Sequence, residues 1–184
     1  MLPSSGEARA RVTMAGVAKG GTPAIVALEA AGAAFTVHEF EQHGSPARQF
    51  GQVAAAALGV DPERVFKTLV VTLDGDRGAE QVVAIVPVSG QLSLRELAGA
   101  FGAKRAEMCP PDVAQRITGY VVGGISPFGQ KKQLRTAIDE TCILFDTVFV
   151  SGGRRGLDLE VAPDVLVDLL GAVVAPIGTR DKER

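Results

Sequence analysis

The chain has 184 residues, and 46% of them are hydrophobic, which is enough to bury a core and excludes an intrinsically disordered protein. Its net charge of −2 at pH 7 excludes a broad basic field, so any contact with a nucleic acid must depend on local Lys and Arg clusters. Cys109 and Cys142 form no CxxC pair, which excludes a zinc ribbon or a thioredoxin-type motif. Since no apolar run is long enough to span a bilayer and no secretory leader is recognisable, we expect a cytoplasmic protein.

In chain order, the first half predicts alternating helices and strands after a flexible extension over residues 1–20. Thr22 is a favoured helix N-cap, Pro23 suits the first helical position, and Gly32 is typical of the residue just past a helix end. The elements expected here are a helix over 22–31, a strand over 33–41, a helix over 50–58, and strands over 65–73 and 81–88 joined by the turn 74–78.

The second half opens with a capping box, in which Ser93 caps a helix and Glu96 reaches back. The later elements are expected to be that helix up to 102, strands over 106–109, 133–138, 142–150, 157–161 and 173–177, and helices over 110–117 and 163–171. Strands outnumber helices, and several are joined by short turns. We therefore predict one α/β domain over 21–178 with a central mixed or antiparallel, barrel-like sheet, followed by a polar tail over 179–184.

Lys67 interrupts an otherwise apolar strand. Alternation places it on one face with Val65, Leu69 and Val71, where an ammonium group needs a polar partner or a cavity. A lysine that protects a sheet edge, or one that extends to solvent, explains the pattern as well as a cation at the floor of a polar pocket. The residues alone leave these alternatives open.

Two glycine-rich segments predict shaped loops. Residues 123–132 (GGISPFGQKK) suit neither a helix nor a strand, and their backbone N–H groups with nearby cations fit an anionic or carbonyl-bearing ligand. Residues 151–156 (SGGRRG) directly follow a predicted strand, and Asp158 comes next. Either segment is equally well explained as an ordinary tight connection, or as a wall of one pocket in which Asp158 faces Lys67 or a substrate amine.

Several common catalytic and cofactor-binding motifs are absent from the sequence. The only histidines, His38 and His43, are five residues apart, which defeats the HExxH geometry, so we expect no metal site. No phosphate-binding GxxxxGK[ST] loop, dinucleotide fingerprint or GxSxG elbow occurs, so we expect no cofactor. With so few histidines, we do not expect a Ser-His-Asp or Cys-His catalyst.

Three segments together resemble the bacterial YbaK/EbsC family, whose best known members are Cys-tRNA(Pro) deacylases. They are residues 66–70 (FKTLV), 118–132 (TGYVVGGISPFGQKK) and 150–157 (VSGGRRGL), and the resemblance extends over about 22–177. It implies a single α/β domain around a barrel-like mixed sheet. It also implies an enzyme that removes cysteine from proline tRNA in trans, beside prolyl-tRNA synthetase.

The resemblance assigns roles to particular residues. The essential lysine corresponds to Lys67, and the glycine loop, whose N–H groups would bind the substrate carbonyl, begins with Gly123 and Gly124. Phe40 stands where the family has a tyrosine, so the role of that position is in doubt. The other implied substrate-binding residues are Ile125, Ser126, Pro127, Ser151, Gly152 and Asp158, and those expected along the tRNA acceptor end are Lys131, Lys132, Arg154 and Arg155.

The chemistry implied is attack by the thiol of the charged cysteine on its own ester, with the protein holding the reactive conformer and stabilising the oxyanion. Such a mechanism needs no histidine from the protein. Two alternatives stay open: a non-catalytic module that binds an aminoacyl-tRNA or a synthetase, and a deacylase for another mischarged tRNA such as Ala-tRNA(Pro).

Overall fold

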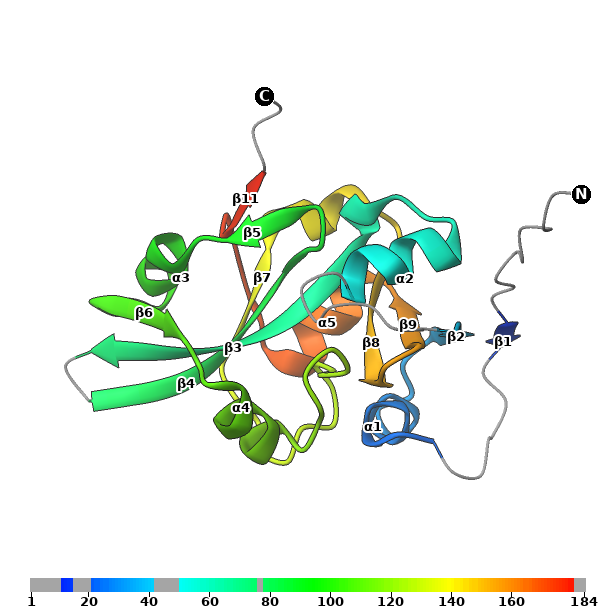
Figure 1. Ribbon diagram of the computed structural model, residues 1–184, viewed down its shortest axis with the longest axis horizontal. Helices are drawn as coiled ribbons and strands as arrows, with labels where there is room; N and C mark the ends of the chain where they lie inside the picture. The colour runs from blue at the N-terminus through cyan, green and yellow to red at the C-terminus, as the bar shows by residue number, and fades with distance from the viewer. Residues whose placement is uncertain (1–10, 15–20, 42–49, 76–77, 181–184) are drawn as a thin grey trace, which may run out of the picture.

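Two long strands, β3 (Val65–Gly75) and β4 (Gly78–Pro87), form the central hairpin of the fold (Figure 1). The computed structural model describes residues 11–14, 21–41, 50–75 and 78–180. In these residues a nine-stranded mixed sheet has the order β1-β2-β9-β8-β3-β4-β7-β10, with β6 paired to β3 beside this path. The other strands of this sheet are β1 (Arg11–Met14), β2 (Phe35–Glu39), β6 (Arg105–Met108), β7 (Thr136–Asp139), β8 (Val148–Arg154), β9 (Leu157–Val161) and β10 (Val173–Ala175).

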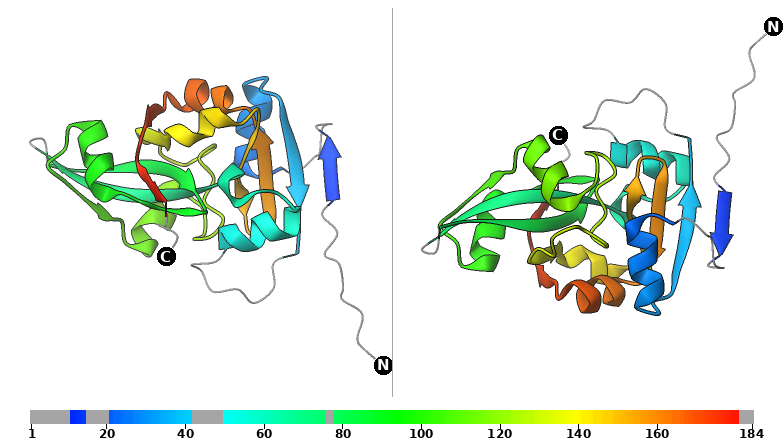
Figure 2. Two further views of the ribbon diagram at one scale, coloured as in Figure 1. Left: turned by 90° about the horizontal axis from the view of Figure 1, so that it is seen from above. Right: turned by 90° about the horizontal axis from the view of Figure 1, so that it is seen from below.

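Helices cover both faces of this sheet (Figures 1 and 2). Buried residues of α1 (Pro23–Ala30), α4 (Pro111–Thr118) and α5 (Pro163–Leu170) pack in one cluster with alternate residues of β3 and β8. Buried residues of α2 (Phe50–Leu58) and α3 (Leu94–Phe101) contact the remaining, oppositely directed residues of β3 in two further clusters. The result is three layers, with the sheet between two sets of helices. None of the helices in the described ranges is long and apolar enough to cross a membrane.

Most predicted elements are confirmed, including the mixed sheet. Thr22 caps α1 by accepting the Ile25 N–H, and Gly32 has the left-handed φ of +65° expected past a helix end. Ser93 likewise caps α3 through the Glu96 N–H, although the Glu96 carboxylate pairs with Arg95 instead of closing the capping box.

Three predictions are wrong, one at the start of a strand and two at the ends of the chain. The strand predicted over 142–150 begins only at Val148, because the Asp139 carboxylate accepts the Thr141 N–H and hydroxyl and starts a 3-10 helix, η3 (Glu140–Leu144). The expected flexible extension contains β1, which pairs with β2. The expected tail begins inside β11 (Gly178–Arg180), which pairs with the unpredicted β5 (Gly90–Leu92). The rest of the extension and of the tail lies outside the described residues.

One edge of β3 changes partner along its length. Strand β8 pairs in parallel with Val65 and Phe66, whereas β6 pairs antiparallel with residues 71–74, and β4 occupies the whole opposite edge. Between the two partners, residues 67–70 of β3 have no strand beside them on this edge within the described chain. A site can therefore form here inside the sheet rather than above it.

Candidate active site

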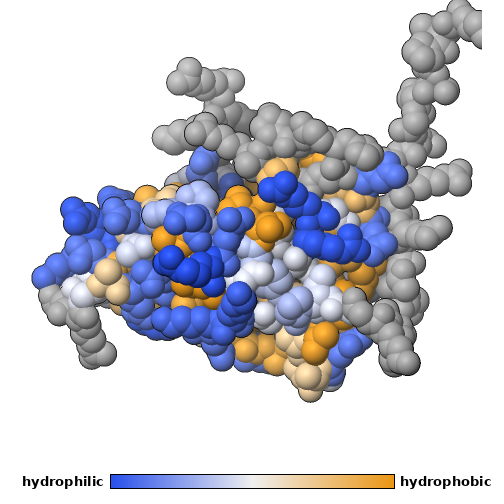
Figure 3. All heavy atoms as spheres, turned by 60° about the horizontal axis from the view of Figure 1, so that its bottom comes forward, coloured by the Kyte–Doolittle hydropathy of each residue, from blue (hydrophilic) through white to orange (hydrophobic). Residues whose placement is uncertain are grey.

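A cavity of about 250 Å³ lies where β8 and β6 separate along β3. Its wall is formed by residues 65–70 of β3, the first turn of α2, the start of α4, the glycine loop and the β8–β9 hairpin. On the face drawn in Figure 3, separate hydrophobic patches lie among hydrophilic side chains. The residues lining the cavity are Phe40, Phe50, Gly51, Gln52, Ala54, 65–70, Val88, Met108, Cys109, Pro111, Ala114, Val122, Gly123, Ile125, Ser151, Gly156 and Asp158.

Three predicted site residues lie side by side on one face of the sheet. Strand β8 places Ser151 directly opposite Asp158 of β9. Val65 of β3 is opposite Phe149 of β8, so alternation directs Lys67 to the same face as Ser151. The order Lys67, Ser151, Asp158 across three strands explains how residues far apart in sequence meet at one cavity.

Asp158 is a buried carboxylate without a partner. It is only 7% exposed and lines the cavity, and no hydrogen bond or ion pair to it occurs among the described residues. Burial raises its pKa to about 7, because the charged form loses hydration that nothing replaces. A carboxylate in this condition is suited to a cationic ligand group.

Lys67 is partly buried, and its Nζ donates a 2.7 Å hydrogen bond to the carbonyl of Gly90, beside the end of β4. No ion pair between Lys67 and Asp158 occurs within the described part of the chain, and the choice between Lys67 and a substrate amine as the partner of Asp158 stays a prediction. The Gly90 carbonyl thus helps to hold the Lys67 ammonium group at the wall of the cavity.

Two hydroxyl groups at the cavity also lack partners within the described structure. The Oγ of Ser151 and the Oγ1 of Thr68 are both buried from solvent and make no hydrogen bond. A buried hydroxyl without a partner is unfavourable by about 1–3 kcal/mol, so orphan groups are rare away from ligand sites. Both groups are available to a molecule that enters the cavity.

The glycine loop closes the cavity through Gly123. This residue has a φ of +87°, and a Cβ on it would lie 2.2 Å from Cδ2 of Phe50. Gly124 is packed as tightly, since its Cβ would lie 2.9 Å from the backbone of Arg154. The Gly124 N–H was predicted to face the cavity. It instead donates to the Val121 carbonyl at 2.9 Å. Of the predicted pair of donors, only Gly123 belongs to the cavity wall.

Replacing Gly123 with Ala is expected to lower activity at least tenfold and to destabilise the protein by about 1–3 kcal/mol, because both the φ and the contact with Phe50 exclude a methyl group. Urea unfolding together with aminoacyl-ester hydrolysis measures both effects. Gly99→Ala on α3, where a Cβ would meet nothing within 4 Å, is the control and is expected to be neutral or stabilising. A Gly123→Ala protein as stable and active as wild type would contradict this role.

Three predicted substrate-binding residues lie outside the cavity wall. Ser126 is fully buried, and its Oγ accepts the Phe128 N–H. Pro127 borders a different hollow, next to α1 and α5. The carbonyl of Gly152 accepts the hydroxyl of Thr22, which ties β8 to α1. These residues support the loop rather than line the cavity, whereas Ile125 and Phe40 do line it.

The predicted RNA-binding residues have distinct surroundings. Arg154 pairs with Glu39 at 2.6 Å. Arg155 donates to the Val122 carbonyl and lies over the Phe50 ring, next to the cavity. The backbone N–H groups of Lys131 and Lys132 donate to the end of α4, and both side chains are exposed. Contact of these four residues with RNA stays a prediction.

Sequence reasoning missed several cavity residues, among them Phe50, Thr68 and Cys109. Thr68 is next to Lys67 in sequence, but nothing local reveals that this segment of β3 lacks a strand partner. Burial raises the pKa of the Cys109 thiol, so the protein's own cysteine is mainly in the unreactive thiol form. Its position in the cavity wall became visible only through the pairing of β6 with β3.

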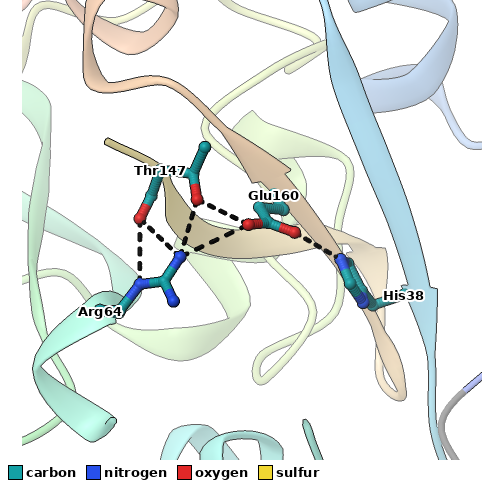
Figure 4. A network of polar contacts seen from close by, with 4 residues as sticks. All are labelled: His38, Arg64, Thr147 and Glu160. Carbon is teal, nitrogen blue, oxygen red and sulfur yellow. Dashed lines mark hydrogen bonds and ion pairs between the residues drawn. The ribbon is translucent and has the colours of Figure 1, made fainter. Parts of the chain in front are cut away.

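His38 belongs to a polar network beside the cavity (Figure 4). Its Nε2 is 2.9 Å from Oε2 of Glu160, whose Oε1 accepts the Thr147 hydroxyl at 2.6 Å, and Arg64 donates to Thr147. Burial raises the pKa of Glu160, but the bonds from Thr147 and His38 outweigh it and lower the pKa overall. With Arg64 and His38 against the Phe149 ring, the network holds β2, β8 and β9 together.

The described residues contain no cluster of His, Cys, Asp and Glu able to hold a metal ion. His38 is engaged by Glu160, and His43 lies outside the described residues. What the cavity offers is a carboxylate, an ammonium group, two hydroxyls and the backbone of Gly123.

Comparisons with known proteins agree with this architecture. The family model for the aminoacyl-tRNA editing domain matches residues 45–169. A protein of Enterococcus faecalis, provisionally named Cys-tRNA(Pro)/Cys-tRNA(Cys) deacylase EbsC, is 35% identical over 77% of this chain and 90% of its own length. The multifunctional Ser/Thr-tRNA deacylase ProXp-y of Escherichia coli K12 is 29% identical over 70% of this chain and 75% of its own length.

A solved structure of a protein provisionally described as a trans-editing enzyme for prolyl tRNA synthetase superposes with a TM-score of 0.72. It shares 24% identity and covers 89% of this chain and 99% of its own, which shows a common fold. Together with the match of the family model over most of the chain, these relationships confirm the resemblance noted in the sequence. The chain belongs to the aminoacyl-tRNA editing domain family.

Proposed function

We propose that this protein is an aminoacyl-tRNA deacylase that removes cysteine from mischarged Cys-tRNA(Pro) in trans. The observation that carries the proposal is the unpartnered, nine-tenths buried Asp158 in a cavity with Lys67 and two orphan hydroxyls. An aminoacyl ester at a tRNA end carries an α-ammonium group, a carbonyl and ribose hydroxyls. The cavity has a complementary group for each of them.

The carboxylate of Asp158 would bind the α-ammonium group. An ion pair formed inside the cavity returns to Asp158 the charge stabilisation that burial removed, so ligand binding should lower its pKa from about 7. Ser151, which lies opposite on β8, would hydrogen bond beside it.

Lys67 and Gly123 would act on the acyl group and the terminal ribose. The ammonium of Lys67 would stabilise the negative charge that develops on the ester oxygens, and the Gly123 N–H would donate to the carbonyl oxygen. The Thr68 hydroxyl is placed for a ribose or carbonyl oxygen.

The nucleophile would be the thiol of the substrate, because the described residues of the cavity supply no base-activated nucleophile and burial raises the pKa of Cys109 among them. The substrate Sγ would form a bond to the ester carbonyl carbon while the ester C–O bond to ribose breaks. The thiol proton would end on the ribose hydroxyl that leaves. The four-membered thiolactone would then react with water to give free cysteine.

A second candidate has support from the relatives, since one similar protein is named for Ser/Thr-tRNA deacylation. A hydroxyl is a weaker nucleophile than a thiol, so direct attack by water would have to operate for such substrates. Deacylation of Ala-tRNA(Pro) and a purely binding role are the remaining alternatives.

The test is release of labelled amino acid by the purified protein from matched tRNA(Pro) carrying Cys, Ser or Ala. We expect Cys release to be faster by at least 100-fold than Ser or Ala release. Comparable release of Ala would rule out substrate-assisted chemistry. Thermal stabilisation by the charged tRNA without any release would indicate a binding module.

A further inference from the structure

Arg155 makes a defined set of contacts with the cavity wall. Its Nε and Nη2 both donate to the carbonyl of Val122, at 3.1 and 2.8 Å. Its guanidinium carbon lies 4.6 Å from the centre of the Phe50 ring, at the start of α2. The side chain thus connects the β8–β9 hairpin to the glycine loop and to α2, and Val122, Gly123 and Phe50 all line the cavity.

The carbonyl that Arg155 binds belongs to the same peptide unit as the Gly123 N–H. No cis peptide bond is present in the described chain, so the C=O of Val122 and the N–H of Gly123 point in opposite directions across one plane. Whatever fixes the carbonyl therefore fixes the direction of the N–H. The cationic donor also polarises the peptide and strengthens its N–H as a donor.

The neighbouring peptide units are held in other ways. The Val122 N–H donates to Oε1 of Gln115 on α4 at 3.1 Å, and the Gly124 N–H donates to Val121. The Val122–Gly123 unit is left with Arg155 on its carbonyl and the cavity beside its glycine. Gly123 also has no room for a side chain, since a Cβ would lie 2.2 Å from Phe50 and 3.2 Å from Nε of Arg155.

We propose that Arg155 is a positioning residue that aims the Gly123 N–H at the substrate carbonyl, rather than a contact for the RNA backbone. The proposal rests on the deacylase function proposed above and adds a specific device to it. A fork of two N–H donors and a flat face for Phe50 are properties of arginine that lysine lacks. The geometry therefore requires arginine, whereas a phosphate contact would be largely satisfied by lysine.

The test compares Arg155→Lys and Arg155→Ala with wild type in deacylation of Cys-tRNA(Pro) at several salt concentrations. We expect kcat to fall at least tenfold in both variants, with lysine giving little rescue, since loss of one oxyanion donor lowers kcat by about 100-fold or more. KM and the salt dependence of KM should stay within twofold of wild type. Arg95→Ala on α3 removes an exposed positive charge away from the cavity and is expected to behave as wild type.

An RNA contact would give the opposite pattern: a raised KM, a weaker salt dependence, an unchanged kcat, and rescue by lysine. That pattern would overturn the proposal. Amide hydrogen exchange at Val122 and Gly124, whose N–H groups are hydrogen bonded on either side of the Val122–Gly123 peptide, provides a readout that needs no catalysis. We expect faster exchange at these amides in both variants. Unchanged exchange would refute the positioning role of Arg155, even if wild type releases no amino acid. If wild type is inactive but exchange is faster in the variants, the deacylase function is refuted and the contact by which Arg155 holds the Val122–Gly123 peptide is supported.

Discussion

Replacing Asp158 with Asn is expected to make the folded protein more stable at pH 8 while lowering deacylation at least 100-fold. Burial raises the pKa of this carboxyl group from 3.8 to about 7, which is about three units. The folded state therefore keeps a proton between about pH 4 and 7 that the unfolded state releases. The stabilisation that this proton provides is complete below pH 4 and is lost as the pH rises through 7.

At pH 8 wild type carries a buried charge that Asn lacks. Three units correspond to at most about 4 kcal/mol, so we expect Asp158→Asn to gain about 2–4 kcal/mol at pH 8 and little at pH 4. Urea unfolding at the two pH values measures this difference. Asp168→Asn, which changes an exposed carboxylate on α5, is the control and should alter neither stability nor activity by a measurable amount.

The same group sets the expected pH dependence of activity. The ionised form of Asp158 would bind the substrate ammonium, so kcat/KM of wild type should rise with pH through about 7 and then level off. A variant that loses stability at pH 8 and keeps full activity would show that Asp158 is a structural residue.

Replacing Lys67 with Met is expected to lower kcat/KM at least 100-fold, because an apolar stem of similar length remains while the charge at the cavity is lost. Loss of the hydrogen bond from Nζ to the Gly90 carbonyl should lower the free energy of unfolding by about 1 kcal/mol. Single-turnover deacylation and thermal unfolding separate the two effects.

The control for Lys67 is Lys104→Met, which removes an exposed charge just before β6. It should deacylate as fast as wild type. If Lys67→Met retained more than a third of the wild-type rate, the charge of Lys67 would have no part in the chemistry.

Local signals were sufficient to predict most elements because their ends are chemically marked. Thr22 and Ser93 are N-caps that accept the expected N–H groups, and Gly32 and Gly102 adopt left-handed conformations past helix ends. The wrong strand start before Val148 shows the limit of such reasoning. Residues 142–145 are apolar enough for a strand, but the Asp139 cap starts a 3-10 helix there instead.

The site was predictable in its residue types but not in its geometry. Lys67 and Asp158 stand out as charges in apolar strands, and Gly123 as a glycine where a loop approaches another segment. That Gly124 turns its N–H to Val121, and that Arg155 holds the Val122 carbonyl, depends on how two distant loops pack. The stretch of β3 that has no strand partner on one edge brings Thr68 to the cavity, and it depends on strands more than 30 residues away along the chain.

The central claim is tested most directly by the loss of labelled cysteine from Cys-tRNA(Pro), with wild type beside Asp158→Asn and Lys67→Met. The account predicts release by wild type at least 100 times faster than spontaneous hydrolysis, and release close to the spontaneous rate in both variants. Folded wild-type protein that leaves Cys-tRNA(Pro) intact, with prolyl-tRNA synthetase present or absent, would contradict it.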